Sequence, residues 1–97
     1  MAVAAQIIEQ LGGGRFLAMT GAKMLVDLGN GLQFKLPKFA ALKINCVRII
    51  LNADDLYDVE FFNIRGINVK SIKKDSGVYA EDLRRFFTEA TGLETSL

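Results

Sequence analysis

The stretch 44–64, INCVRIILNADDLYDVEFFNI, is the feature that most constrains the fold of this chain. Apolar and polar residues alternate in both of its halves, as in strands with one buried face. The residues expected on the buried face are Val47, Ile49, Leu51, Tyr57, Val59 and Phe61. The segment 52–55, Asn-Ala-Asp-Asp, separates the halves and is rich in turn-forming side chains. The stretch therefore predicts an antiparallel hairpin whose connection is longer than two residues.

Short segments on both sides of this hairpin extend the predicted sheet. Residues 32–36 and 67–70 alternate in the same way, and we interpret 16–20 as the first strand. Residues 24–27 fit either a short strand or an irregular segment. Turns are predicted at 29–31 and 73–77, and a bend or bulge at 65–66, where glycine and polar residues gather. The whole pattern predicts four or five antiparallel strands in meander order.

Two amphipathic segments near the termini predict helices. Residues 2–11 carry apolar side chains at helical spacing, and the glycines at 12–14 end that pattern. Residues 80–91 place four apolar side chains on one face, and Gly92 follows them. We therefore expect a single α+β domain over residues 1–97. Its C-terminal amphipathic helix packs on one face of the sheet, and the other face is open to solvent or to a partner.

The composition disfavours most enzyme chemistry. The 97 residues include no histidine and one cysteine, so the usual general base and the commonest metal ligand are missing. Asp58 and Glu60 share a face, as in magnesium nucleases, but the position two residues later is Phe62 where those sites usually have lysine. A phosphate cradle at the glycines 12–14 is disfavoured because a strand is expected after them. We expect no catalytic residue, metal or cofactor.

Other features concern the location and assembly of the chain. The N-terminal segment lacks the basic region of a signal peptide, and no apolar run reaches the roughly 20 residues that span a bilayer. We therefore expect a soluble cytoplasmic protein with no membrane partner. A domain of this size is stabilised by self-association, so a homodimer is also expected.

Positive charge is concentrated in the sheet region. The net charge is +1 overall, but eight basic and four acidic residues give the segment 33–74 a charge of +4. A basic sheet face with apolar groups binds single-stranded nucleic acid through phosphates and base stacking. The contact residues predicted for this function are Lys35, Arg48, Arg65, Lys70, Lys73 and Lys74. We also expect Glu60 to pair with Arg48 and Lys70 across the strands.

Alternatives to nucleic-acid binding stay open at this point. The open face could be a solvated surface with balanced charges. Its apolar residues Ile50, Phe62 and Ile64 equally suit a protein interface. Such an interface predicts an interaction module, for example an inhibitor of a host protein, or a structural dimer or assembly component.

Two resemblances add to these expectations. The segments 16–23 (FLAMTGAK), 56–61 (LYDVEF), 77–83 (GVYAEDL) and 91–93 (TGL) resemble small uncharacterised proteins encoded by bacteriophages and integrative elements. This resemblance implies a mobile-element context in a bacterial host cell and no specific activity, and Cys46 and Phe62 depart from its pattern. Four strands followed by a helix are also similar to single-stranded DNA-binding domains of the positive-cofactor-four type, although the N-terminal helix departs from them.

Overall fold

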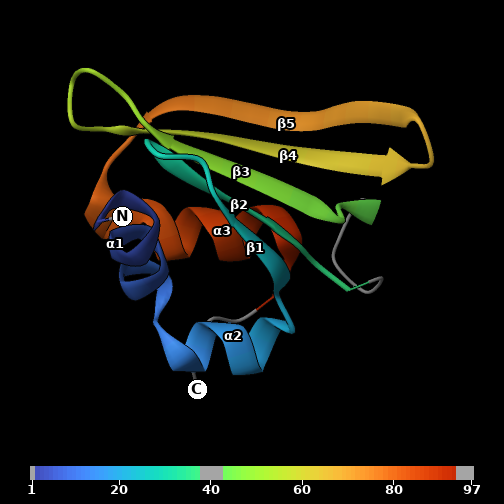
Figure 1. Cartoon of the computed structure of the whole chain (residues 1–97), viewed down its shortest axis with the longest axis horizontal. Helices are drawn as coiled ribbons and strands as arrows, with labels where there is room; N and C mark the ends of the chain where they lie inside the picture. The colour runs from blue at the N-terminus through green and yellow to red at the C-terminus, as the bar shows by residue number, and fades with distance from the viewer. Residues whose placement is uncertain (1, 38–42, 94–97) are drawn as a thin grey trace.

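The computed structural model describes residues 2–37 and 43–93 and has the predicted α+β architecture. The five strands form one antiparallel sheet in the sequential order β1-β2-β3-β4-β5. The helices all lie below this sheet in Figure 1, so the opposite face is open. The elements, in chain order, are α1 (Ala2–Leu11), α2 (Gly14–Thr20), β1 (Lys23–Asp27), β2 (Gly31–Lys35), β3 (Cys46–Leu51), β4 (Tyr57–Arg65), β5 (Asn68–Val78), η2 (Ala80–Asp82) and α3 (Leu83–Thr91).

The predicted central hairpin is formed by β3 and β4. Val47 lies opposite Phe61, and Ile49 lies opposite Val59, all four of them buried. The connection is held by Asn52, whose Oδ1 accepts hydrogen bonds from the backbone N–H of residues 54 and 56 at 2.8 and 3.2 Å. The segment 52–55 is therefore a turn. The residues expected on the inward face of the hairpin form the sheet side of the core.

The core fills the space between the sheet and the helices. The rings of Phe16 in α2 and Phe34 in β2 meet edge to face at 5.4 Å, and Phe87 in α3 lies 5.5 Å from Phe16. Edge-to-face packing of this kind stabilises a core beyond the area it buries. α1 contributes the buried Ile7 and Leu11. The predicted packing of the C-terminal helix on one sheet face is confirmed.

The prediction of a strand at 16–20 is wrong, because this segment is the helix α2. Thr20 Oγ1 donates to the carbonyl oxygen of Phe16 at 2.7 Å, and Gly21 ends the helix in the left-handed region with φ 70°. Gly12 and Gly13 therefore separate two helices, and Gly14 begins the second of them, α2, and does not lead into a strand. The first strand is instead β1, which includes residues 24–27, where the sequence fitted either a short strand or an irregular segment.

The predicted turn at 73–77 is also wrong, because β5 continues through it to Val78. The register between β4 and β5 shifts twice, once between Tyr57 and Val59 and once between Phe61 and Phe62. Gly77, with φ 73°, lies in the first of these irregularities. Glycine and short polar residues serve β-bulges as well as turns, which explains the error. In the part of the chain that the structure describes, no helix is long and apolar enough to cross a membrane.

Candidate nucleic-acid interface

The strand register decides which side chains lie on the open face of the sheet. Residues directly opposite each other in antiparallel strands share a face, and successive residues alternate. Two adjacent open-face rows run across all five strands. The first row is Lys23, Lys35, Cys46, Phe62 and Ser71, and the second is Val26, Gln33, Arg48, Glu60 and Lys74. Three of the six predicted contact residues, Lys35, Arg48 and Lys74, therefore lie on the open face.

The other three predicted contact residues lie on the helix side of the sheet. A two-residue connection places Asn68 opposite Arg65, which brings Lys70 opposite Asn63 on that side. Lys73 lies opposite the buried Phe61, and its Nζ is 5.0 Å from the ring centre of Phe86 in α3. The expected pairing of Glu60 with Lys70 is therefore wrong. Glu60 lies opposite Lys74 instead and accepts a hydrogen bond from Ser71 Oγ at 2.7 Å.

Arg48 covers the aromatic residue at the middle of the open face. Its guanidinium lies 5.0 Å from the ring centre of Phe62, and its Nε donates to Gln33 Oε1 at 3.1 Å. Phe62 is consequently only 7 % exposed, although it faces away from the helices. As predicted, Arg48 lies opposite Glu60 across the strands. The planar group presented outward at this point is the guanidinium and not the phenyl ring.

The middle of the open face carries balanced charges. A hollow of about 190 Å³ is lined there by Arg48, Ile50, Asp58, Val59, Glu60 and Lys74. Its two basic groups face two carboxylates, so the net charge of the lining is zero. The predicted interface residues Ile50 and Ile64 are half-buried and share the open face with Phe62. This part of the sheet has no electrostatic preference for an anion.

At one end of the sheet, in contrast, the described residues that line the surface include four cations and no acid. Two hollows of about 420 and 240 Å³ adjoin there and share Asn45 and Ile64 as lining residues. The first is lined by Lys43, Ile44, Asn45, Asn63, Ile64 and Arg65, and the second by Lys23, Lys35, Leu36, Pro37, Asn45 and Ile64. We call the four cations Lys23, Lys35, Lys43 and Arg65, together with these hollows, the basic end. Lys70 adjoins it, because it lies opposite Asn63.

The opposite end of the sheet is acidic. The turn between β3 and β4 carries Asp54 and Asp55, and Asp58 follows at the start of β4. β1 runs from Lys23 at the basic end to Asp27 towards the acidic end. The charges of the sheet are thus separated along the strand direction, which the net charge of +1 conceals. Such a separation directs an anion to one end of the molecule.

Two asparagines fix the wall of the basic end. Asn45 Nδ2 donates to the carbonyl oxygen of Ile64 at 2.9 Å, and its Oδ1 accepts from the N–H of Ile64 at 2.8 Å. Asn63 Nδ2 donates to the carbonyl oxygen of Lys43 at 2.6 Å. These side chains extend the pairing of β3 and β4 to residues that precede the start of β3. Lys43 itself has φ 60°, a conformation that is costly for a side-chain-bearing residue and is held here by these contacts.

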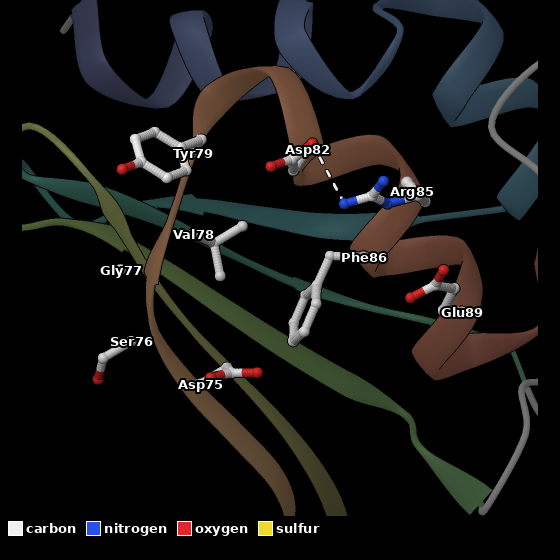
Figure 2. Close-up of a pocket in the computed structure, with 9 residues that line it drawn as sticks. All are labelled: Asp75, Ser76, Gly77, Val78, Tyr79, Asp82, Arg85, Phe86 and Glu89. Atoms are coloured by element: carbon white, nitrogen blue, oxygen red, sulfur yellow. Dashed lines mark ion pairs between the residues drawn. The ribbon is translucent and has the colours of Figure 1, made fainter.

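A further hollow, on the helix side of the sheet, has the opposite character. It measures about 200 Å³ and lies between β5 and α3, where Figure 2 shows Phe86 pointing toward β5. Asp75, Asp82 and Glu89 line it, and its one cation, Arg85, forms an ion pair with Asp82 at 3.2 Å. An excess of carboxylates makes this hollow unsuited to phosphate.

The sequence prediction missed two of the four cations of the basic end, Lys23 and Lys43. Lys23 begins β1, and Lys43 lies shortly before β3. Only the order of the strands in the sheet shows that these two strand starts lie at the same end of it. Lys38, which contributed to the charge of segment 33–74, lies outside the described residues. Within the described residues 2–37 and 43–93, no group of three cysteine, aspartate or glutamate side chains lies close enough together to hold a metal ion.

The single thiol of the chain lies within the open face. Cys46 is 1 % exposed, and its burial raises the pKa of the thiol despite the nearby charges of Arg48 and Lys35. A thiol of raised pKa stays protonated near neutral pH and is a poor nucleophile. Cys46 therefore serves the packing around Phe62, opposite which it lies.

Comparison of the chain with protein-family models, with curated proteins and with solved structures found no match. The function of the basic end is accordingly inferred from its geometry and charge.

Proposed function

We propose that this protein is a non-enzymatic binding protein for single-stranded nucleic acid, which it holds by phosphates at the basic end. The observation that carries the proposal is the gathering of four cations, without an acid, around two adjoining hollows. Lysine and arginine at such a site displace the counterions of a phosphate backbone, which is the main source of affinity for nucleic acids. The mobile-element context belongs to the same proposal.

The proposal divides the predicted contact residues into different roles. Lys35 and Arg65 contact phosphates at the basic end, and Lys70 extends this contact along β5. Arg48, in the charge-balanced middle of the open face, offers a flat guanidinium on which an unpaired base can stack. A duplex keeps its bases stacked on each other and cannot use this contact, so single strands are the preferred ligand.

A titration of affinity against salt tests this function. The ligand is a fluorescently labelled oligothymidylate of about 20 nucleotides, and its anisotropy is measured from low to physiological salt. Four neutralised phosphates on a single strand give a slope of log K against log salt of about −3. A duplex of the same length serves as the comparison and is expected to bind more weakly. No binding, or a flat salt response, contradicts the proposal.

Charge reversals locate the binding site. Lys35→Glu and Arg65→Glu are each expected to weaken binding about tenfold or more and to make the salt slope shallower by about 0.7. Arg15→Glu is the control, because Arg15 is exposed on α2 in the helix layer and changes the net charge equally. Equal losses in all three variants would mean that net charge and not the basic end determines binding.

A second candidate is an interaction module that acts on a host protein. It is favoured by an apolar group at the turn between β4 and β5, where Ile67 is 97 % exposed and Val69 lies opposite Ile64 on the open face. Exposed apolar groups of this kind are typical of protein contacts. An oligonucleotide titration without binding would leave this candidate as the better one.

A further inference from the structure

Two carboxylates line the hollow of about 190 Å³ at the middle of the open face, here called the central hollow. They belong to Asp58 and Glu60, which alternate with buried residues along β4. Binding of phosphate does not explain them, because like charges repel and a carboxylate weakens the affinity for a phosphate backbone. The hollow is also smaller than the roughly 300–1,000 Å³ of a pocket for a drug-sized ligand. It therefore suits one planar base and not the backbone of a nucleic acid.

The carboxylate of Glu60 is held in place but keeps acceptor capacity. Its Oε2 accepts a hydrogen bond from Ser71 Oγ at 2.7 Å. Arg48 and Lys74 lie opposite Glu60 on the two neighbouring strands, yet among the described residues neither forms an ion pair with it. The guanidinium of Arg48 lies over Phe62 instead. A carboxylate has about four acceptor sites on its two oxygens, so Glu60 can still accept two hydrogen bonds from a ligand.

Of the two carboxylates, Glu60 is better placed beside a base that stacks on Arg48. Asp58 lies opposite Ile50, towards the acidic end, and accepts a hydrogen bond from Asn52 Nδ2 at 3.0 Å. Glu60 lies directly opposite Arg48, so one side of the central hollow offers a flat guanidinium and its floor offers a carboxylate. A base in the hollow can thus stack and form hydrogen bonds at the same time.

The bases differ in the edge that they offer to such a carboxylate. Guanine carries two adjacent donors, N1–H and the N2 amino group, on its Watson–Crick edge. In cytosine and adenine an acceptor nitrogen of the ring adjoins the amino group, and in thymine the single N–H lies between two carbonyl oxygens. Among these bases only guanine donates to both oxygens of one carboxylate, and bidentate pairs with an ionised acceptor are the strong ones.

We propose that the central hollow selects guanine in a bound single strand, with Glu60 as the specificity-determining residue. Glu60 accepts hydrogen bonds from N1–H and the N2 amino group, Lys74 donates to the guanine O6, and Arg48 stacks on the base. This inference rests on the proposed binding of single strands at the basic end. Ile64, which lines the basic end, is four residues or about 13 Å from Glu60 along β4, so a strand of several nucleotides reaches both.

Oligonucleotides that differ in one kind of base test the preference on the unaltered chain. The reference is the labelled oligothymidylate, and in three further strands isolated thymines are replaced by guanine, adenine or hypoxanthine. Guanine is expected to strengthen binding about tenfold or more. Adenine, a purine with a similar stacking surface, is the control and is expected to stay within about threefold of thymine. Hypoxanthine lacks only the amino group of guanine and is expected to lose most of the gain.

Two matched variants assign the preference to one carboxylate. Glu60→Gln is expected to make guanine and adenine strands bind alike, because a carboxamide has a single acceptor oxygen. Asp75→Asn removes the same charge from an exposed residue on the helix side of β5, opposite Val59, and is expected to keep the preference. Thermal unfolding of both variants shows whether the fold is retained, and the hypoxanthine strand tests the same contact without any substitution.

The outcomes separate this inference from the proposed function. Equal binding of the guanine and adenine strands by the wild-type chain, or a preference that survives Glu60→Gln, overturns the inference and leaves binding at the basic end in place. A chain that binds none of the strands contradicts both. Guanosine monophosphate is expected to compete weakly, since it does not extend to the basic end. Competition by this free nucleotide as strong as by the guanine strand would overturn the assignment to a strand.

Discussion

At the scale of single residues, Gly31 shows how closely the strands approach each other. It lies opposite Ile50 at the start of β2. A Cβ at this position would lie 2.2 Å from the carbonyl oxygen of Ile49 and 2.6 Å from Cδ1 of Ile50. The first contact is with backbone, which cannot move without separating β2 from β3. The requirement for glycine here arises from space and not from an unusual backbone conformation.

We expect Gly31→Ala to destabilise the fold by about 2 kcal/mol or more, since overpacking against backbone forces the strands apart. Gly14→Ala is the matched control. Gly14 is at the start of α2, where an added Cβ meets nothing within 4 Å, so the substitution is expected to stabilise by about 0.5 kcal/mol. Urea unfolding of both variants measures the difference, and equal stabilities would contradict the close approach.

The inward residues of the hairpin and the turn at Asn52 could be predicted from the sequence, because alternation and turn chemistry are local properties. The covering of Phe62 by Arg48 could not. Their contact depends on the register between β3 and β4, which places Cys46 opposite Phe62 and brings Arg48 beside it. An alternating pattern shows which residues of a strand share a face of the sheet, but not which residues of the neighbouring strand lie opposite them.

At the scale of elements, α2 and α3 end in the same way. Thr20 and Thr91 are both buried and donate to the carbonyl oxygen four residues earlier, at 2.7 and 2.8 Å. Each Oγ1 also accepts from the N–H two residues later at 3.2 Å. The glycine that follows each threonine is left-handed. The pair Thr-Gly at 91–92 ended a predicted helix, whereas the same pair at 20–21 was interpreted as the end of a strand.

The reason for this difference is the length of α2. Seven residues hold fewer than two full turns, so helical and alternating patterns cannot be distinguished over residues 14–20. α3, in contrast, has four apolar residues at helical spacing, which are Leu83, Phe86, Phe87 and Ala90. In short segments the residues at the ends carry more information than the periodicity between them.

We expect Thr91→Val to destabilise the fold by about 1–2 kcal/mol, because it keeps the shape but leaves the N–H of Leu93 without its acceptor. Thr91→Ser retains the hydroxyl and is the control, with a smaller loss that reflects the missing methyl group. Thermal unfolding of both variants measures the effect. If valine is tolerated as well as serine, the hydroxyl does not hold the end of α3.

At the scale of the whole molecule, the hydroxyl of Tyr57 in β4 forms hydrogen bonds that join the sheet to α1. The hydroxyl donates to Gln10 Oε1 at 2.5 Å and accepts from Gln6 Nε2 at 3.4 Å. Burial raises the pKa of Tyr57 above its ordinary value of about 10. The folded chain therefore holds this proton more tightly than the unfolded chain does.

The sign of the pH dependence follows from this shift. The contribution of Tyr57 to stability is complete below about pH 10, the unfolded value, and is lost as the pH rises through the raised folded value. We expect Tyr57→Phe to be less stable at neutral pH, since the bond to Gln10 is lost, and to show a shallower decline above pH 10. Tyr79→Phe is the control, because Tyr79 is exposed. Urea unfolding from pH 8 to 11 measures both, and parallel curves for Tyr57→Phe and wild type would refute the expectation.

Charge separation is the property of the whole molecule that sequence reasoning could anticipate only in part. The +4 charge of segment 33–74 was visible, but Lys70, Lys73 and Arg65 were expected beside Arg48 on one face. Two-residue turns and bulges decide such placements, because each changes which residues share a face. The mobile-element context and the absence of catalysis stay predictions.

The sequential order of the strands also has a consequence for how the chain folds. Each strand pairs with its neighbour in sequence, so each pairing can form once the second of its two strands has been made. The contact between Phe16 and Phe87, in contrast, joins residues near opposite ends of the chain. During synthesis the hairpins can therefore form as they emerge, whereas the packing of the core is complete only when α3 is present. We expect the part of the apolar sheet face that α3 covers to stay exposed until this helix has left the ribosome, whereas α1 and α2, which are made first, can pack on β2 earlier.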